Sequence, residues 1–285
     1  MLKASDLEIT TLSENTSTGR DLIGQWGISV LISAGCRSFI LDGGAGDSVA
    51  YNVDTLGLDL APVEAVVLSH GHSDHTGGLP ALLRRIPRGE MEIVAHPAVW
   101  EEKCSRNRTT GAVRYAGIPY RREELERIGA RFTLTAGPHW LTDDIVASGE
   151  EPMTTEFEAV ADNLLVRRNG EYVPDDMADD QSVFIKTDAG LVVVLGCAHR
   201  GIVNILRYAQ ELTGVQPVHA VIGGTHLAPA SEDQVKRTVD ALEEIGVQHL
   251  GVSHCTGLPV AARLSIGFGD RFFFNNAGTR LRFPL

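Results

Sequence analysis

One short stretch, residues 68–79 (LSHGHSDHTGGL), places three histidines and one aspartate within six residues. Imidazole nitrogens and carboxylate oxygens are side-chain groups that bind zinc, iron and manganese ions in proteins. Chance clustering of this kind is improbable, because the whole chain has only ten histidines. The stretch therefore predicts a metal-binding loop. Its candidate ligands are His70, His72, Asp74 and His75.

The spacing of these four residues favours two sets of ligands. Successive side chains of an extended segment point to opposite faces, so His70, His72 and Asp74 would share one face. The side chain of His75 would point elsewhere unless a turn redirects it. Glycines in the same loop permit such a turn, because glycine adopts backbone dihedrals that other residues avoid. One loop can therefore serve a pair of metal ions.

The elements that position these side chains must be buried strands that end at the same place. Residues 65–68 form an apolar run that leads directly into the loop, and its length and β-branched content favour a buried strand. Further apolar runs, at 191–195, within 219–226 and within 248–254, also reach histidines. Strand ends on one edge of a sheet converge, so four histidines can meet. These are His70, His199, His226 and His254.

The run of residues 70–75 (HGHSDH) resembles the signature of the metallo-β-lactamase superfamily of metal-dependent hydrolases. The resemblance implies an α/β fold, a four-layer αββα sandwich of two mixed β-sheets flanked by helices, with a dinuclear metal site along one edge. It implies that His70 and His72 serve one metal and that Asp74 and His75 serve the other. We expect two divalent transition-metal ions, zinc first, with iron or manganese as alternatives.

The same resemblance ranks the later histidines. His254 resembles the superfamily's final histidine ligand. No histidine lies about twenty-five residues before Gly196, where many relatives place a ligand, and His199 is the best replacement. We therefore expect His199 and His254 to bind metal. His226 is expected to contact substrate. The alternative is that it only supports the metal ligands.

Three more residues are expected beside the ligands. Arg200 precedes a helix N-terminus, which favours an anionic group of the substrate. Asp42 ends an apolar strand before a glycine turn, and it either caps that turn or accepts the second ring proton of a metal-bound histidine. The resemblance favours the second role. Cys197 falls where other members have a bridging aspartate or a cysteine ligand, and we place it next to the ligands.

Strand and helix patterns cover most of the remaining chain. We predict one domain, residues 1–285, with a family-specific insert at about 105–162 whose arginines and aromatics suit a substrate pocket or a lid. Strands are expected at 7–12, in hairpins at 27–41 and 182–195, at 92–95, and at the terminal segments 272–274 and 281–283. Helices are expected at 48–56, 79–86, 121–128, 202–212 and 231–245.

The composition is typical of a globular protein, with 43% hydrophobic and 22% charged residues among 285. The net charge of −12 argues against unselective nucleic-acid binding, which needs a basic surface. Four scattered cysteines, no signal pattern and no apolar run of about 20 residues favour a cytoplasmic protein without a membrane segment. The oligomeric state stays open.

Three motifs narrow the resemblance to one branch of the superfamily. The runs 196–204 (GCAHRGIVN), 222–227 (IGGTHL) and 253–257 (SHCTG) resemble the 7,8-dihydropterin-6-methyl-4-(β-D-ribofuranosyl)aminobenzene 5′-phosphate synthases. We therefore expect a dinuclear metal enzyme acting on a small phosphorylated or pterin-like substrate, by a metal-bound hydroxide that Asp74 holds or by clamping a phosphate. The alternatives are a phosphodiesterase or nuclease of the superfamily and a metal-binding regulatory protein without turnover.

Overall fold

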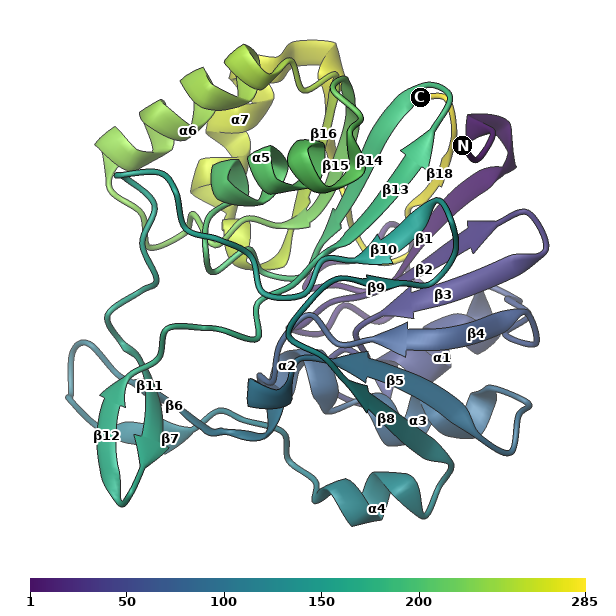
Figure 1. The fold of residues 1–285 in the computed structure, drawn as a ribbon, viewed down its shortest axis with the longest axis vertical. Helices are drawn as coiled ribbons and strands as arrows, with labels where there is room; N and C mark the ends of the chain where they lie inside the picture. Colours follow the sequence, from purple (N-terminus) through teal and green to yellow (C-terminus); the bar gives the residue numbers. More distant parts are fainter.

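The computed structural model describes residues 1–285 as two large mixed β-sheets packed face to face, with helices on both outer faces (Figure 1). This confirms the predicted four-layer α/β architecture. The first sheet has the strand order β18 (Arg280–Arg282), β1 (Leu7–Ser13), β2 (Ser29–Ala34), β3 (Arg37–Leu41), β4 (Val63–Val67), β5 (Met91–Ala95) and β8 (Ala130–Leu134). The second has the order β17 (Phe272–Phe274), β16 (His249–Ser253), β15 (Val218–Gly224), β14 (Gly190–Leu195), β13 (Val183–Thr187), β10 (Ile145–Ala147) and β9 (His139–Trp140).

Three apolar clusters lie between the four layers, and the alternation of side chains along the strands creates them. On β14, Leu191 and Val193 pack against helices, whereas Val192 and Val194 face the first sheet. Every residue of β14 is buried, because this central strand is covered on both faces. The continuous apolar runs of the sequence are thus explained by burial on two sides.

Two groups of helices cover the outer faces of the sheets (Figure 1). In the view of Figure 1, one group lies at the top and the other lies below the first sheet. The helices on the second sheet are α5 (Ile202–Thr213), α6 (Glu232–Ile245) and α7 (Leu258–Phe268). Those on the first are α1 (Ser48–Thr55), α3 (Leu79–Arg85) and α4 (Arg122–Glu126). Single helical turns occur at α2 (Ser73–Thr76), η1 (Ala4–Asp6), η2 (Pro97–Trp100), η3 (His254–Thr256) and η4 (Gly269–Arg271).

A third, four-stranded sheet stands apart from both large sheets, at the lower left of Figure 1. We call it the small sheet, and it was not expected from the sequence. The predicted insert at about 105–162 supplies β7 and part of β6 to it, β8 to the first large sheet, and β9 and β10 to the second. The strands of the small sheet are β12 (Glu171–Pro174), β11 (Leu164–Arg168), β6 (Glu102–Arg106) and β7 (Val113–Tyr115).

Most elements expected from the sequence are present. The hairpins β2–β3 and β13–β14 are both antiparallel pairs, and β17 and β18 are edge strands. The predicted helix at 121–128 is shorter, because α4 begins at Arg122 and ends at Glu126. None of the helices combines the length and the apolar character that a membrane span requires.

Candidate metal centre

The predicted metal loop follows β4 and continues into the single helical turn α2, which redirects His75. The loop glycines do not form the turn that the sequence predicted for them, because none of residues 71, 77 and 78 has a positive φ. A Cβ atom on Gly71 or Gly78 would lie 2.3 Å or 2.1 Å from a backbone carbonyl oxygen. The loop therefore requires glycine for close approach of backbone segments, and the turn itself comes from α2.

Strands β14, β15 and β16 bring the other donors to the same edge. The three strands pair in parallel, so their C-terminal ends lie side by side. Cys197 and His199 follow β14, His226 follows β15, and His254 and Cys255 follow β16. The predicted convergence of four histidine-bearing strand ends is thus present.

The backbone is strained just beyond the ends of β3, β14, β15 and β16. Asp42, Ala198, His226 and His254 have φ values of 62°, 54°, 46° and 53°. This left-handed region is unfavourable for residues other than glycine, and such residues cluster at functional sites. The strain turns each chain segment sharply as it leaves its strand, and it keeps the donor side chains at the sheet edge.

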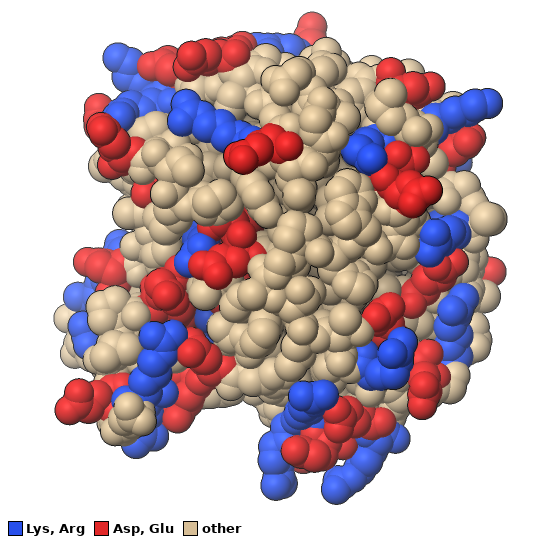
Figure 2. Space-filling view, in the orientation of Figure 1, with Lys and Arg blue, Asp and Glu red and all other residues tan.

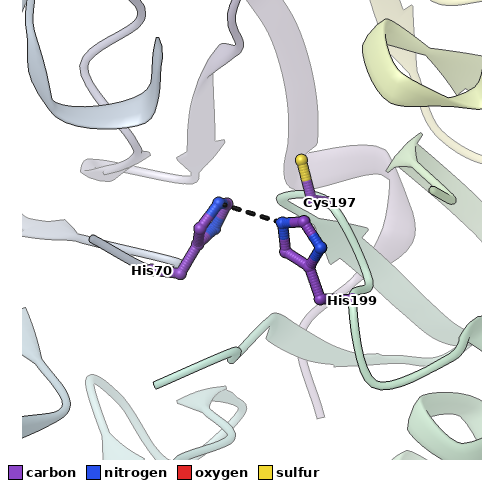
Figure 3. A group of neighbouring side chains, drawn as sticks. All are labelled: His70, Cys197 and His199. Carbon is purple, nitrogen blue, oxygen red and sulfur yellow. Dashed lines mark hydrogen bonds between the residues drawn. The ribbon is translucent and has the colours of Figure 1, made fainter. Parts of the chain in front are cut away.

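One group of donors joins the two large sheets. The Nε2 atoms of His70 and His199 lie 3.3 Å apart, and Figure 3 shows the two rings meeting along this line with Cys197 beside them. All ligand atoms of these three residues lie within 4.8 Å of one another. The rings of His70 and His72 lie at 4.6 Å between centroids, and the ring of His72 is 5.1 Å from that of His199. This group contains His70 and His72, the two residues that the resemblance assigns to one metal, and places His199 and Cys197 beside them.

A second group lies beside the first. His75, Cys197 and His254 have ligand atoms within 4.8 Å of one another. The Oδ2 atom of Asp74 lies 3.4 Å from Nε2 of His254 and 4.0 Å from Nε2 of His75. The structure thus brings Asp74, His75 and His254 together at one place, next to His70 and His199.

Cys197 is more central than we expected. Its Sγ atom lies 3.1 Å from Nε2 of His75, and it belongs to both groups and to a third with His226 and Cys255. The sequence analysis did not identify Cys255, whose position next to His254 at a strand end was the available signal. A thiolate is a good zinc ligand, so Cys197 is a candidate bridging donor as well as a neighbour of the ligands.

Hydrogen bonds at Nδ1 direct the Nε2 atoms of three histidines into the cluster. Asp42 is fully buried, and its Oδ2 accepts from Nδ1 of His75 at 2.7 Å and from Oγ of Ser69 at 2.6 Å. Ser69 Oγ accepts in turn from Nδ1 of His70 at 2.9 Å. Nδ1 of His254 donates to Oδ1 of Asn15 at 3.0 Å. Such partners fix the ring orientation and the tautomer of metal-binding histidines.

The protonation states of three of the histidines suit metal binding. Burial lowers the pKa of His72 to about 3, and burial together with neighbouring histidines lowers the pKa of His70 and of His199. Burial opposes a charge on His75 too, but the carboxylates of Asp42 and Asp74 outweigh it and raise its pKa to about 9. Three neutral imidazoles therefore stand ready as ligands at pH 7.

The donor set fits divalent transition metals. Imidazole, thiolate and carboxylate together suit zinc and iron better than magnesium or calcium. Nε2 of His72 is buried without a hydrogen-bond partner, which is rare for a polar atom in a protein interior. A metal ion at this place would give that atom its partner.

A buried ion pair supports the loop from the small sheet. Nζ of Lys103 lies 2.9 Å from Asp175 and 2.7 Å from Asp179, and all three residues are buried. Asp179 also accepts a hydrogen bond from the backbone N–H of Gly71 at 2.8 Å. In the sequence, the segment 175–180 looks like an acidic surface loop. In the structure, its residues Asp175 and Asp179 are buried and support the metal loop. No local sequence pattern indicated this role for Lys103.

Arg200 lies away from the cleft. Its guanidinium donates to the backbone oxygens of Asp176 and Glu151 and to the carboxylate of Glu150. The structure therefore does not bring it into contact with the donor cluster, because these three partners hold its guanidinium. His226 does reach the cluster, where its ring lies 4.2 Å from that of His199.

A cavity of about 360 Å³ lies over the donors. The sequence analysis did not identify Trp26, whose Nε1 donates to Oδ2 of Asp74 at 2.9 Å and which is 59% exposed. Glu14 was also missed, and it accepts from the backbone N–H of His254 at 2.7 Å. The donor residues that line the cavity are His72, Asp74, Cys197, His199, His226, His254 and Cys255.

The comparisons with known proteins agree with this geometry. Residues 28–156 match the model of the metallo-beta-lactamase superfamily. The chain is 30% identical, over 99% of its length and 98% of the relative's, to a protein of Methanocaldococcus jannaschii. That protein is named 7,8-dihydropterin-6-methyl-4-(beta-D-ribofuranosyl)-aminobenzene-5'-phosphate synthase.

Solved structures are also similar to this chain. A crystallised metal-dependent hydrolase of the beta-lactamase superfamily superposes with a TM-score of 0.82 at 29% identity, covering 96% of this chain and 98% of that one. Zinc-bound PqqB from Methylobacterium extorquens has a TM-score of 0.55 at 10% identity, with 96% and 99% covered, and shares the fold alone.

Proposed function

We propose that this chain, which belongs to the metallo-β-lactamase superfamily, is a metal-dependent enzyme acting on a small phosphorylated, pterin-like substrate. The observation that carries the proposal is the convergence of histidine, cysteine and aspartate donors from both large sheets beneath one open cavity. The full-length similarity to a protein named as a pterin-related synthase supports the proposed substrate class.

Two divalent ions, zinc first, are the cofactors that we propose. His70, His72 and His199 would hold one ion, and Asp74, His75 and His254 the other, with Cys197 between them. Bound divalent ions supply Lewis acidity that neutralises negative charge on a phosphate or on an attacking oxygen. The number of ions and their identity are part of the proposal.

The favoured reaction is a condensation that joins a dihydropterin methylene group to an aromatic amine. A nitrogen–carbon bond forms, the bond from carbon to a phosphate or diphosphate breaks with its electron pair, and the amine nitrogen loses a proton. Burial would raise the pKa of Asp74, but His75 and His254 outweigh it and keep the carboxylate ionised. Asp74 can therefore hold the attacking N–H by accepting its hydrogen bond, while Trp26 fixes the orientation of the carboxylate.

Hydrolysis is the second candidate, because the 29% identical solved structure is described as a metal-dependent hydrolase. In that reaction Asp74 would hold the attacking water instead of an amine. The two reactions require the same donors, so the geometry of the cluster fits both. The net charge of −12 argues against a nuclease among the hydrolases.

One assay separates the candidates. Zinc-loaded protein is incubated with a dihydropterin that carries a 6-hydroxymethyl diphosphate, with and without 4-(β-D-ribofuranosyl)aminobenzene 5′-phosphate, and products are identified by mass spectrometry. A coupled product that forms only with both substrates supports the condensation. Release of phosphate without the amine, or cleavage of a chromogenic phosphodiester, supports hydrolysis. Inertness on every substrate, with metal bound, contradicts the proposed enzyme and favours a regulatory protein.

A further inference from the structure

The cavity over the metal centre extends away from the donors onto the small sheet. Its far wall includes Ser105, Arg114 and Asn163. These three residues also line a neighbouring cavity of about 490 Å³. The two cavities therefore form one groove that begins at the histidines and ends on β6 and β7.

The outer part of this groove is polar and basic. Ala112 is its only apolar lining residue, and Arg106 and Arg108 lie along it with Arg114. The residues that complete the lining are Ser105, Asn107, Thr110 and Asn163. A groove of this composition suits a charged, hydrophilic part of a ligand and not an aromatic ring.

Arg114 and Arg106 differ from the other arginines of the small sheet. Arg108 pairs with Asp162 at 2.8 Å, and both arginines of β11 pair with glutamates of the segment 101–102. Neither Arg106 nor Arg114 has a carboxylate within 4.0 Å. Figure 2 shows basic and acidic side chains intermingled over one face of the molecule, whereas the guanidinium groups of Arg106 and Arg114 have no such acidic partner.

Strand register places two hydrogen-bond donors on one face. Ser105 on β6 is directly opposite Arg114 on β7, so both side chains project from the same side of the hairpin. Asn163 immediately precedes β11, and its backbone oxygen accepts from the N–H of Arg106 at 2.8 Å. The side chains of Ser105, Arg114 and Asn163 form no hydrogen bond within the protein, so their donors are free for a ligand.

We propose that Arg114, with Ser105 and Asn163, binds a terminal phosphate monoester of the substrate, with Arg106 at the outer rim of the subsite. A guanidinium presents paired donors that match phosphate oxygens, and a hydroxyl and an amide add single donors. The ligand thus has two ends, a reacting end at the metal centre and a phosphate that is held without reacting. This inference rests on the proposed function, in which the ribosyl half of the substrate carries that phosphate.

Binding of ribose 5-phosphate to zinc-loaded protein tests the subsite without requiring turnover. Isothermal titration calorimetry compares wild type, Arg114→Gln and a matched control, Arg167→Gln. Arg167 belongs to the same sheet but pairs with Glu102 outside the groove. We expect Arg114→Gln to raise the Kd by about tenfold to a hundredfold, and Arg167→Gln to leave it unchanged. Ribose without phosphate should bind to none of them.

Three results would overturn the subsite. In the first, wild type and Arg114→Gln bind ribose 5-phosphate equally. In the second, Arg114→Gln and Arg167→Gln lose binding equally. In the third, Arg114→Gln keeps binding that is lost after zinc removal, which would place the phosphate on the metals. The proposed function fails separately. If the coupling assay gives no product but ribose 5-phosphate still binds through Arg114, the subsite stands and the reaction is wrong.

Discussion

Asp42 orients histidines of both donor groups through hydrogen bonds. Its two carboxylate oxygens receive the N–H and Oγ–H of Ser69 and the ring N–H of His75, and Ser69 passes the orientation on to His70. One buried carboxylate therefore sets a histidine in each of the two donor groups.

Replacing Asp42 with asparagine should lower zinc affinity by about 10–100-fold, because an amide has one acceptor oxygen for three donors. Competition with a chromogenic chelator measures the affinity. Asp54→Asn is the control, since Asp54 pairs with Arg85 on the surface, with 53% of its side chain exposed. Unchanged affinity in Asp42→Asn would show that the orientation of the histidines does not depend on this carboxylate.

Asp180 links stability to pH. Burial raises its pKa to about 7, although the backbone N–H of Arg200 donates to it at 2.8 Å. Because the pKa of Asp180 in the folded protein lies above the ordinary value of 3.8, the protonated form stabilises the fold. That stabilisation is complete below about 3.8 and is lost as the pH rises through about 7.

Asp180→Asn should therefore lose less stability than wild type between pH 5 and pH 8, since asparagine stays neutral throughout this range. Urea unfolding midpoints at the two pH values provide the measurement. Asp176→Asn, an exposed neighbour in the same loop, should follow wild type. Parallel pH profiles for wild type and Asp180→Asn would assign the dependence to other groups.

At the scale of elements, the sequence predicted the strands that bear the donors because in each of them apolar residues lead towards a histidine. The small sheet was not predicted, because its strands are short, half-exposed and paired across about 60 residues, from Lys103 to Val166. The burial of Lys103 and the turning of Arg200 away from the cleft depend on carboxylates distant in the sequence. Local patterns carry no information about such partners.

Lys103 connects the small sheet to the metal loop, so Lys103→Met tests this connection. Removing one partner of a buried ion pair leaves the carboxylates of Asp175 and Asp179 unpaired and should cost about 3–5 kcal/mol of unfolding free energy. Arg167→Met removes an exposed pair from the same sheet and should cost much less, because water screens exposed ion pairs. Urea denaturation of the two variants compares them. Equal and small losses would mean that the buried pair does not support the fold.

For the whole molecule, the donors come from loops on both large sheets, so a bound ion connects the two halves. Ions that bind only the folded state should stabilise it by about 2.7 kcal/mol at a free concentration of 100 times the Kd. Thermal unfolding with zinc, with chelator, and with zinc restored measures this shift. A Tm that does not respond to chelation of demonstrably bound zinc would show that the metals do not connect the halves.

Segments that lie far apart in the sequence meet at the donor cluster. Asn15 and Glu14 position His254, and β1 pairs with β18 at the edge of the first sheet. Since 239 residues separate Asn15 from His254, a ribosome that adds about 5–20 residues per second needs about 12–48 s to supply the second partner. For most of that interval the nascent chain carries the HGHSDH loop without His254. The donor cluster therefore cannot be complete until residue 254 has been synthesised, and a polypeptide released earlier has the loop but not the complete cluster.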